Sequence, residues 1–229
     1  KIFRFQMLRK ETISPALLDA LDVLMGMKTI KTHRLVGGTA LALQIGHRIS
    51  VNIDLFSDKK NNYEDILKEL SRKFAKKFQK GRYISSPAGR GITVFLNNIK
   101  TDILDWNSKF IRAPFTDNKI RMVHKEDIIP MKFNSFLCAP EFARYEKRDY
   151  TDIAMLLKEY SLERMIELYK EKYPNELMLD RMMIEGLQLH ELADKKPMPK
   201  MLGNFTWGDV KKQIERAVAF YNEKRLKKR

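Results

Sequence analysis

The sequence predicts an α/β fold followed by an all-α part, with the boundary near Lys125. Short apolar segments with strand-like alternation are interleaved with helical patterns before this point, and only helical patterns follow it. A chain of 229 residues, 44% of them hydrophobic, can bury one large core or two small ones. We therefore expect two domains: a small mixed sheet with helices in residues 1–124, and a helical bundle in residues 125–229.

The first half alternates between helical and extended segments. Ser14-Pro15 marks a helix start that leads to about Met27. Apolar spacing predicts two further helices, and Gly46 and Gly81 are expected to end them. These helices are Thr39–Ile45 and Tyr63–Lys80. Period-two alternation and turn residues predict the strands, which are His33–Val36, Val51–Phe56, Arg82–Ser86, Ile92–Leu96, Ile99–Trp106 and Lys119–Val123.

Helical periodicity dominates the second half of the sequence. The segment Lys195–Lys200 contains two prolines and is the best linker. Thr206 and Asp209 resemble a capping box ahead of a last helix that reaches Tyr221, and the basic end Lys224–Arg229 is expected to fray. The other predicted helices are Glu126–Leu137, Glu141–Tyr160, Leu162–Lys172 and Glu176–Leu192.

Composition excludes several classes of protein. No apolar run approaches the ~20 residues needed to span a bilayer. No charged-then-apolar leader opens the sequence, so nothing argues for export. A single cysteine, Cys138, excludes an intrachain disulfide and fits a reducing cytoplasm. Its apolar neighbours favour a buried small side chain over a nucleophile. One cysteine and four scattered histidines do not form zinc-ligand pairs.

The net charge of +15 favours contact with phosphate polymers. The basic residues recur in local clusters such as Lys76-Lys77, Lys195-Lys196 and Lys227-Lys228-Arg229. The alternative is a lysine-rich solvated surface on helices.

The segment from Val36 to Ser57 carries the most specific chemistry and reads V-G-G-T-A-L-A-L-Q-I-G-H-R-I-S-V-N-I-D-L-F-S. A diglycine turn lets backbone N–H groups approach a phosphate, and the helix start behind it favours negative charge. In the following strand, Asn52 and Asp54 point to the same face, about 6.6 Å apart. A carboxylate there is suited to hold the Mg²⁺ that accompanies such a phosphate.

This segment resembles the AbiEii/AbiGii toxin-like nucleotidyltransferases of the DNA polymerase β superfamily. Their signature looks like G-G-T-A-L-A-L-Q-x-G-H-R-x-S-x-D-x-D-L-F. One position departs from it: Asn52 stands where the family has Asp. An amide offers a carbonyl oxygen but no charge, so we expect weaker metal binding and weaker catalysis.

The resemblance implies a set of nucleotide and metal residues in the first half. Gly37, Gly38 and Thr39 are similar to the loop that holds the triphosphate. Asp54 and the position of Asn52 are similar to the metal ligands for Mg²⁺ or Mn²⁺. We take Asp102 as the third metal and catalytic carboxylate. Its competitor is Asp105, which points to the opposite face of the same strand, so only one of the two can face Asp54.

Two helical motifs in the second half, M-K-F-N-S-F and R-D-Y-T-D-I, also resemble the family. Lys132 and Arg148 are expected to neutralise nucleotide phosphates. Asp149 is expected to act in catalysis by positioning Lys132 or the base, and Asp152 is carried over with it. The alternative is an ion-pair network on helix surfaces.

The resemblance implies transfer of a nucleoside monophosphate from an NTP to a hydroxyl, by a cytoplasmic toxin of a toxin–antitoxin or phage-defence system with a cognate antitoxin. The acceptor is the 3′ end of a tRNA, favoured by the basic charge, or a protein hydroxyl. The rival interpretations are a catalytically dead nucleotide- or RNA-binding homologue and a protein-modifying nucleotidyltransferase. Asn52 is either a deliberate replacement that disables a toxic enzyme or a natural loss. The first origin is favoured because the rest of the signature is intact.

Overall fold

The computed structural model describes residues 8–86, 89–137, 145–177 and 180–227. The chain divides into two compact units, Lys1–His124 (unit 1) and Lys125–Arg229 (unit 2), and each is described by itself. That the two units are independently folding domains stays a prediction. Cys138 lies outside the described residues. None of the described helices is long and apolar enough to cross a membrane.

Unit 1 is built on a mixed seven-stranded sheet with the order β3-β4-β5-β2-β1-β7-β6. The pairs β2–β5 and β1–β7 are parallel, and the other neighbours are antiparallel. The predicted small mixed sheet is therefore confirmed, with β6 as a strand that the sequence did not indicate. The strands are β1 (Arg34–Leu35), β2 (Ile53–Ser57), β3 (Phe78–Ser86), β4 (Gly89–Leu96), β5 (Ile99–Trp106), β6 (Phe115–Asp117) and β7 (Ile120–Met122).

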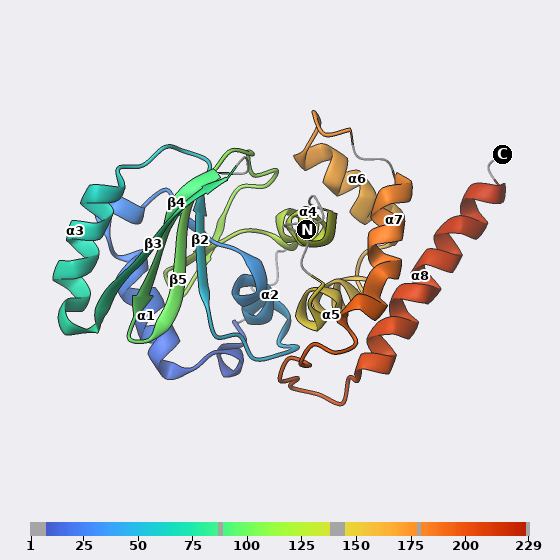
Figure 1. Ribbon diagram of the computed structural model, residues 1–229, viewed down its shortest axis with the longest axis horizontal. Helices are drawn as coiled ribbons and strands as arrows, with labels where there is room; N and C mark the ends of the chain where they lie inside the picture. The colour runs from blue at the N-terminus through green and yellow to red at the C-terminus, as the bar shows by residue number, and fades with distance from the viewer. Residues whose placement is uncertain (1–7, 87–88, 138–144, 178–179, 228–229) are drawn as a thin grey trace. The chain divides into compact units, whose positions relative to one another are not determined.

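Three α-helices accompany this sheet: α1 (Pro15–Met25), α2 (Gly37–Ile45) and α3 (Tyr63–Phe74). Ser14 caps α1 as predicted, since its side chain accepts a hydrogen bond from the N–H of Leu17. Helix α1 packs against β7 and α2 against β2. Helix α3 packs against β3 and β4 (Figure 1). Short 3₁₀ helices lie at Lys10–Thr12, Lys28–Ile30 and Ala75–Lys77.

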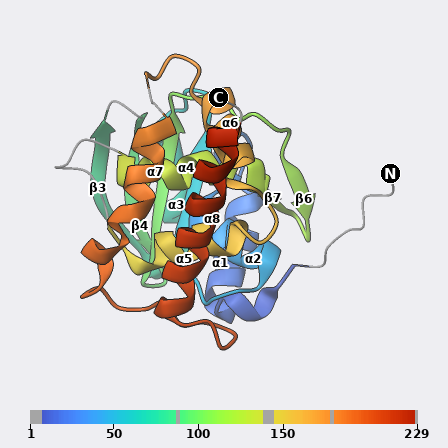
Figure 2. The same ribbon diagram turned by 90° about the vertical axis from the view of Figure 1, so that its right-hand side faces the viewer.

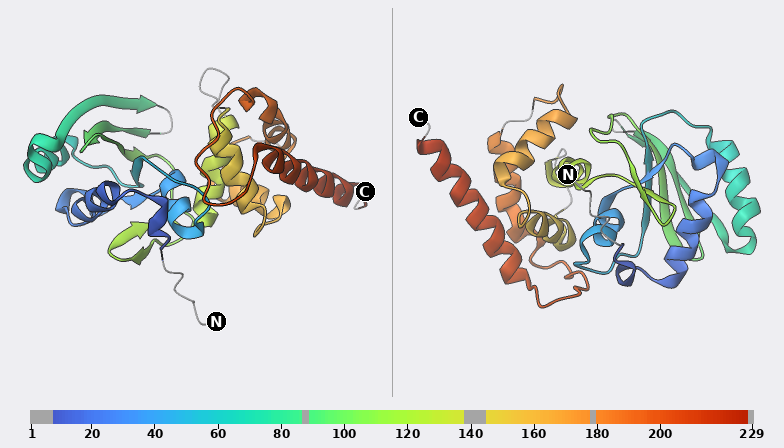
Figure 3. Two further views of the ribbon diagram at one scale, coloured as in Figure 1. Left: turned by 90° about the horizontal axis from the view of Figure 1, so that it is seen from below. Right: turned by 180° about the vertical axis from the view of Figure 1, so that it is seen from behind.

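The predicted helix Tyr63–Lys80 is too long. Helix α3 ends at Phe74, Ala75 takes a positive φ of 46°, and the chain passes into β3 at Phe78. Figure 3 (left) shows this helix leading directly into the strand. The spacing of Phe74 and Phe78 mimics a helical face, but Phe78 pairs with Leu96 of β4. A long-range strand partner therefore overrides the local periodicity, and Gly81, predicted to end the helix, lies within β3 instead.

Unit 2 contains five α-helices in its described part. They are α4 (Lys125–Leu137), α5 (Lys147–Leu156), α6 (Leu162–Lys172), α7 (Asp180–Gln188) and α8 (Trp207–Lys227). Helix α8 packs against α5, α6 and α7 (Figure 2).

Several boundaries in unit 2 differ from the sequence prediction. The segment predicted as Glu141–Tyr160 is helical from Lys147 within the described residues, and a 3₁₀ turn, Leu189–Ala193, replaces the end of the predicted Glu176–Leu192. The last helix continues to Lys227, so the basic end is helical where it is described. The capping box is confirmed: Asp209 accepts from the N–H of Thr206 at 2.8 Å, and Thr206 Oγ1 accepts from the N–H of Asp209 at 3.2 Å.

A fully buried ion pair fastens two helices of unit 2. Lys172 Nζ of α6 lies 2.9 Å from Asp127 Oδ1 of α4, and both side chains are 0% exposed. Such a pair needs both partners, because removing one leaves an uncompensated charge in the interior at a cost of about 3–5 kcal/mol.

A buried histidine makes unit 1 sensitive to acid. The pKa of His33 is lowered to about 4, mainly by burial; Asp105 opposes the shift and Arg121 contributes to it. The unfolded chain takes up a proton on this imidazole near pH 6.5, whereas the folded chain does so only near pH 4. The contribution of neutral, buried His33 to the free energy of unfolding is therefore fully present above about pH 6.5 and declines as the pH falls toward 4.

We predict that His33→Phe removes a large part of this pH dependence. Between pH 6.5 and 4.5 the parent should lose roughly 2 kcal/mol of unfolding free energy through this one group. The variant should lose distinctly less, whatever its absolute stability. Urea unfolding at the two pH values measures the difference, and equal losses in both proteins would contradict the assignment.

Candidate active site

The diglycine at the start of α2 is packed against two charged side chains. Gly37 has a φ of +67°, and a Cβ atom there would lie 3.0 Å from Oδ2 of Asp54. A Cβ atom on Gly38 would lie 2.2 Å from Nη2 of Arg48, whose side chain is itself buried. Glycine is thus favoured at position 37 by the left-handed backbone beside Asp54, and a side chain at position 38 would have to displace the Arg48 guanidinium, in addition to any approach of a phosphate.

Thr39 connects the first turn of α2 to the segment before β2. It is buried, and its hydroxyl donates to the main-chain oxygen of Asn52 at 2.5 Å and lies 2.8 Å from Oγ of Ser50. This bond fixes the backbone at Asn52. The proton of the Thr39 hydroxyl is therefore already used in this hydrogen bond. That Thr39 also contacts a nucleotide stays a prediction.

Asp54 and Asp102 lie directly opposite each other on adjacent strands. They are Cα partners in the parallel pair β2–β5, and neighbouring strands run about 4.8 Å apart. On β2 the residues Ile53, Leu55 and Ser57 are buried, whereas Asp54 is only half-buried on the other face. The register therefore brings the two carboxylates together on one face of the sheet.

Two partners hold the Asp102 carboxylate. Thr93 Oγ1 donates to Oδ1 at 2.6 Å, and Lys100 Nζ lies 2.5 Å from Oδ2. Thr93 is the residue opposite Asp102 on β4, and Lys100 precedes Asp102 by two positions on the same face. Sequence reasoning did not name either residue as part of the site. The i, i+2 spacing was the available signal for Lys100, but only strand pairing brings in Thr93.

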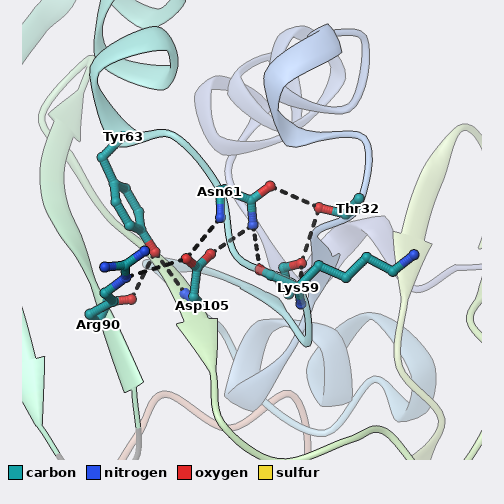
Figure 4. A network of polar contacts seen from close by, with 7 residues as sticks. Thr32, Lys59, Asn61, Tyr63, Arg90 and Asp105 are labelled. Atoms are coloured by element: carbon teal, nitrogen blue, oxygen red, sulfur yellow. Dashed lines mark hydrogen bonds and ion pairs between the residues drawn. The ribbon is translucent and has the colours of Figure 1, made fainter.

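Asp105 belongs to a different network on the opposite face of β5 (Figure 4). Its carboxylate accepts from the N–H of Asn61 at 2.9 Å and from Nδ2 of Asn61 at 2.7 Å, and Nε of Arg90 lies 3.8 Å away. Its own N–H donates to the hydroxyl of Tyr63 at 2.8 Å. Burial and the nearby carboxylate raise the pKa of that hydroxyl. Asp105 therefore anchors the loop before α3.

Asn52 comes just before β2 and is half-buried. Among the described residues, no group of three His, Cys, Asp or Glu side chains gathers to hold a metal ion. The carboxylates of Asp54 and Asp102 and the amide oxygen of Asn52 are hard oxygen donors, the kind that would suit a Mg²⁺ ion also bound by substrate phosphates. The donor chemistry thus fits this metal, with one negative charge fewer than a three-carboxylate site.

The candidate residues of unit 2 form a separate cluster within that unit. Lys132 of α4 lies between two acids of α5, with Nζ 2.7 Å from Asp149 Oδ1 and 2.6 Å from Asp152 Oδ2. All three side chains are buried, so the alternative of a network on helix surfaces does not describe them. Arg148 is exposed on α5. That Lys132, Asp149 and Arg148 serve a nucleotide stays a prediction.

A hollow of about 260 Å³ lies elsewhere in unit 2, between α6 and α8. Its lining includes Tyr160, Arg216 and Phe220, and it contains none of the predicted site residues.

Comparison with known proteins identifies the family of the chain. The model of the nucleotidyl transferase AbiEii toxin of type IV toxin–antitoxin systems matches residues 31–219. The chain therefore belongs to the AbiEii nucleotidyltransferase toxin family, as its signature indicated. No curated protein sequence matches the chain.

Two solved structures from Helicobacter pylori are similar in shape. One is a candidate nucleotidyltransferase, with a TM-score of 0.45 at 16% identity over 87% of this chain and 94% of that one. The other, JHP933, has a TM-score of 0.44 at 16% identity over 91% of this chain and 95% of that one.

We predict that alanine is poorly tolerated at the diglycine. Gly37→Ala forces a side chain into a left-handed conformation against Asp54, and Gly38→Ala displaces the buried Arg48 guanidinium, so each should cost about 1–3 kcal/mol. Gly203→Ala is the matched control, since nothing lies within 4 Å of its added Cβ, and it should change stability by less than about 0.5 kcal/mol. Urea unfolding compares the three, and equal effects would contradict the packing argument.

Proposed function

We propose that this protein transfers a nucleoside monophosphate from an NTP to a hydroxyl acceptor and releases pyrophosphate. The observation that carries the proposal is the register of β2 and β5, which pairs Asp54 with Asp102 beside the diglycine start of α2. Membership of the AbiEii family supports the reaction class.

Each residue has a role that its surroundings suit. The N–H groups at the start of α2 bind phosphate oxygens, because a helix N-terminus favours negative charge. Asp54, Asp102 and the oxygen of Asn52 are the groups that would hold Mg²⁺ or Mn²⁺, which would supply positive charge to the triphosphate. Thr93 and Lys100 fix the orientation of Asp102.

The reaction itself is a single displacement at phosphorus. Asp102 accepts the proton of the acceptor hydroxyl, and the resulting oxygen nucleophile forms a bond to the α-phosphorus of the NTP. The bond between the α-phosphorus and the bridging oxygen breaks, and pyrophosphate leaves with the electron pair. Arg148 neutralises phosphate charge in this scheme. The family resemblance gives Lys132 the same role, with Asp149 positioning it, although the Lys132 ammonium is paired with both Asp149 and Asp152 in the structure.

The acceptor that we propose is the 3′ end of a tRNA, because the chain carries a net charge of +15. A protein hydroxyl is the second candidate. We place the protein in the cytoplasm, as a toxin with a cognate antitoxin in a phage-defence setting, on the strength of its family.

Asn52 lowers the activity that we propose for this form of the protein, because it lacks the carboxylate of the family signature. It removes one negative charge from the donor set while leaving Asp54, Asp102 and the diglycine in place. We therefore propose that this form is impaired in metal binding and transfer, and that its binding surfaces are intact.

The test is the Asn52→Asp variant. Restoring the carboxylate should raise transfer of labelled NTP to tRNA by about 10³-fold, equivalent to about 4 kcal/mol of transition-state stabilisation. The double variant Asn52→Asp/Asp54→Asn keeps the charge of the parent and should stay inactive. Expression of the Asn52→Asp form should arrest growth of the host, while the parent is tolerated.

Three outcomes separate the alternatives. Equal transfer by the parent and the Asn52→Asp form would show that Asn52 is no defect. Labelling of lysate protein in place of tRNA would identify a protein-modifying enzyme. No transfer by either form to any acceptor would favour a nucleotide- or RNA-binding homologue.

We also predict that the two aspartates of β5 have separable roles in the Asn52→Asp background. Asp102→Asn should reduce transfer by at least 10³-fold with little change in stability, because Asp102 is half-buried on the face of Asp54. Asp105→Ala should cost about 1–3 kcal/mol of stability, because it leaves two donors of Asn61 without their acceptor. Transfer rates and urea unfolding distinguish them, and the reverse pattern would exchange their roles.

A further inference from the structure

The positive charge of the chain is concentrated in unit 1. Unit 1 carries 23 lysines and arginines against 11 acids, whereas unit 2 carries 21 against 18. Within unit 1, eight basic residues lie between Lys68 and Arg90, with Glu69 as the single acid among them. The excess is therefore local and does not reflect a uniformly lysine-rich surface.

Seven of these residues form one exposed surface, here called the basic edge. They lie on α3 from Lys68 to Lys73, on the 3₁₀ turn after it and on β3, which is an edge strand of the sheet (Figure 1). Helix α3 packs on β3, so the helix and the strand that carry these cations are neighbours in the fold. The members are Lys68, Arg72, Lys73, Lys76, Lys77, Lys80 and Arg82, and all are exposed.

The cations of the basic edge are almost wholly uncompensated. Arg72 lies 3.9 Å from Glu69, but that acid also accepts two hydrogen bonds from Thr29, at 3.1 and 2.7 Å. The other six members form no ion pair with any residue that the structure describes. Mutual repulsion makes such a surface costly to keep unless a polyanion covers it.

An exposed aromatic ring lies among these cations. Tyr83 of β3 is 59% exposed, and Nζ of Lys80 lies 5.0 Å from the centroid of its ring. Proteins that bind single-stranded nucleic acid combine a positive surface with aromatic rings on which bases stack. The basic edge has both features.

Protection of the sheet edge explains only part of this charge. Lysine, arginine and a bulge on an edge strand prevent pairing with other chains, and β3 has Lys80, Arg82 and a register shift between Lys80 and Tyr83. The remaining members lie on α3 and the 3₁₀ turn, where no open strand edge needs protection.

We propose that the basic edge is the docking surface for the phosphate backbone of an RNA. The proposal deepens the proposed function and rests on it for the identity of RNA as the acceptor. It assigns RNA docking to unit 1, the unit that also holds Asp54 and Asp102. Six cations without an acidic partner in the described structure favour RNA, since each phosphate contact releases counterions.

The test compares two triple variants of equal charge change. Lys76→Gln/Lys77→Gln/Lys80→Gln removes three members of the basic edge. Lys195→Gln/Lys200→Gln/Lys212→Gln is the control, because these lysines are also exposed but lie in unit 2. Binding of fluorescent total tRNA is measured by anisotropy from 50 to 300 mM salt with the Asn52 protein, so that no catalysis is required.

We expect the edge variant to bind tRNA at least 10-fold more weakly at 150 mM salt, with the slope of log K against log salt reduced by about 2 to 3. The control should remain within about 2-fold of the parent. Equal loss in both variants, or no loss in either, would overturn the proposal. Binding of the parent to anionic lipid vesicles with no binding to tRNA would also overturn it.

Transfer by the Asn52→Asp form distinguishes this proposal from the proposed function. If tRNA binding depends on the basic edge but no transfer occurs, the docking surface stands and the enzymatic proposal fails. If tRNA is modified with the same KM in the edge variant and its parent, the enzymatic proposal stands and the docking surface fails.

Discussion

The parallel pairing of β2 with β5 is the constraint on which the candidate site depends. Side chains alternate between the faces of a strand, so a shift of one residue in this register would separate Asp54 from Asp102 and turn one of them into the core. The register is held by burial on the other face, where Ile53, Leu55 and Ile103 are fully enclosed. The core of unit 1 thus determines which carboxylates meet.

The same alternation assigns different tasks to two aspartates three residues apart. Asp102 is half-buried and is held by Thr93 and Lys100, whereas Asp105 is 5% exposed and is surrounded by donors from the loop before α3. A carboxylate that is buried among fixed donors is suited to hold a loop in place. One that remains accessible beside a second carboxylate is suited to bind cations and to take up a proton.

Charge in this protein is arranged in two physically distinct ways. Buried charges are paired, as in Lys132 with Asp149 and Asp152, and in Lys172 with Asp127, because an unpaired ion in the interior is too costly. On the basic edge the cations are exposed and accumulate without partners, which water permits and a polyanion would stabilise. The first arrangement fixes the helical unit, and the second offers a surface for binding.

The sequence by itself determined the reaction family, the α/β-then-α order and most strands, because the signature around Gly37 and Asp54 and the period-two alternation are local features. It also showed that Asp102 and Asp105 face opposite ways, since parity along a strand is a local property. The sequence prediction was wrong at Phe78, where the helical spacing continues but the residue pairs with Leu96, 18 residues further along, in a strand. Only the tertiary structure decided that Thr93 holds Asp102, that Asp54 and Arg48 lie against the two glycines, and that α3 and β3, which carry the exposed cations, pack together. Each of these depends on which distant segments pack together, and long-range pairing leaves no signature in the spacing of neighbouring residues.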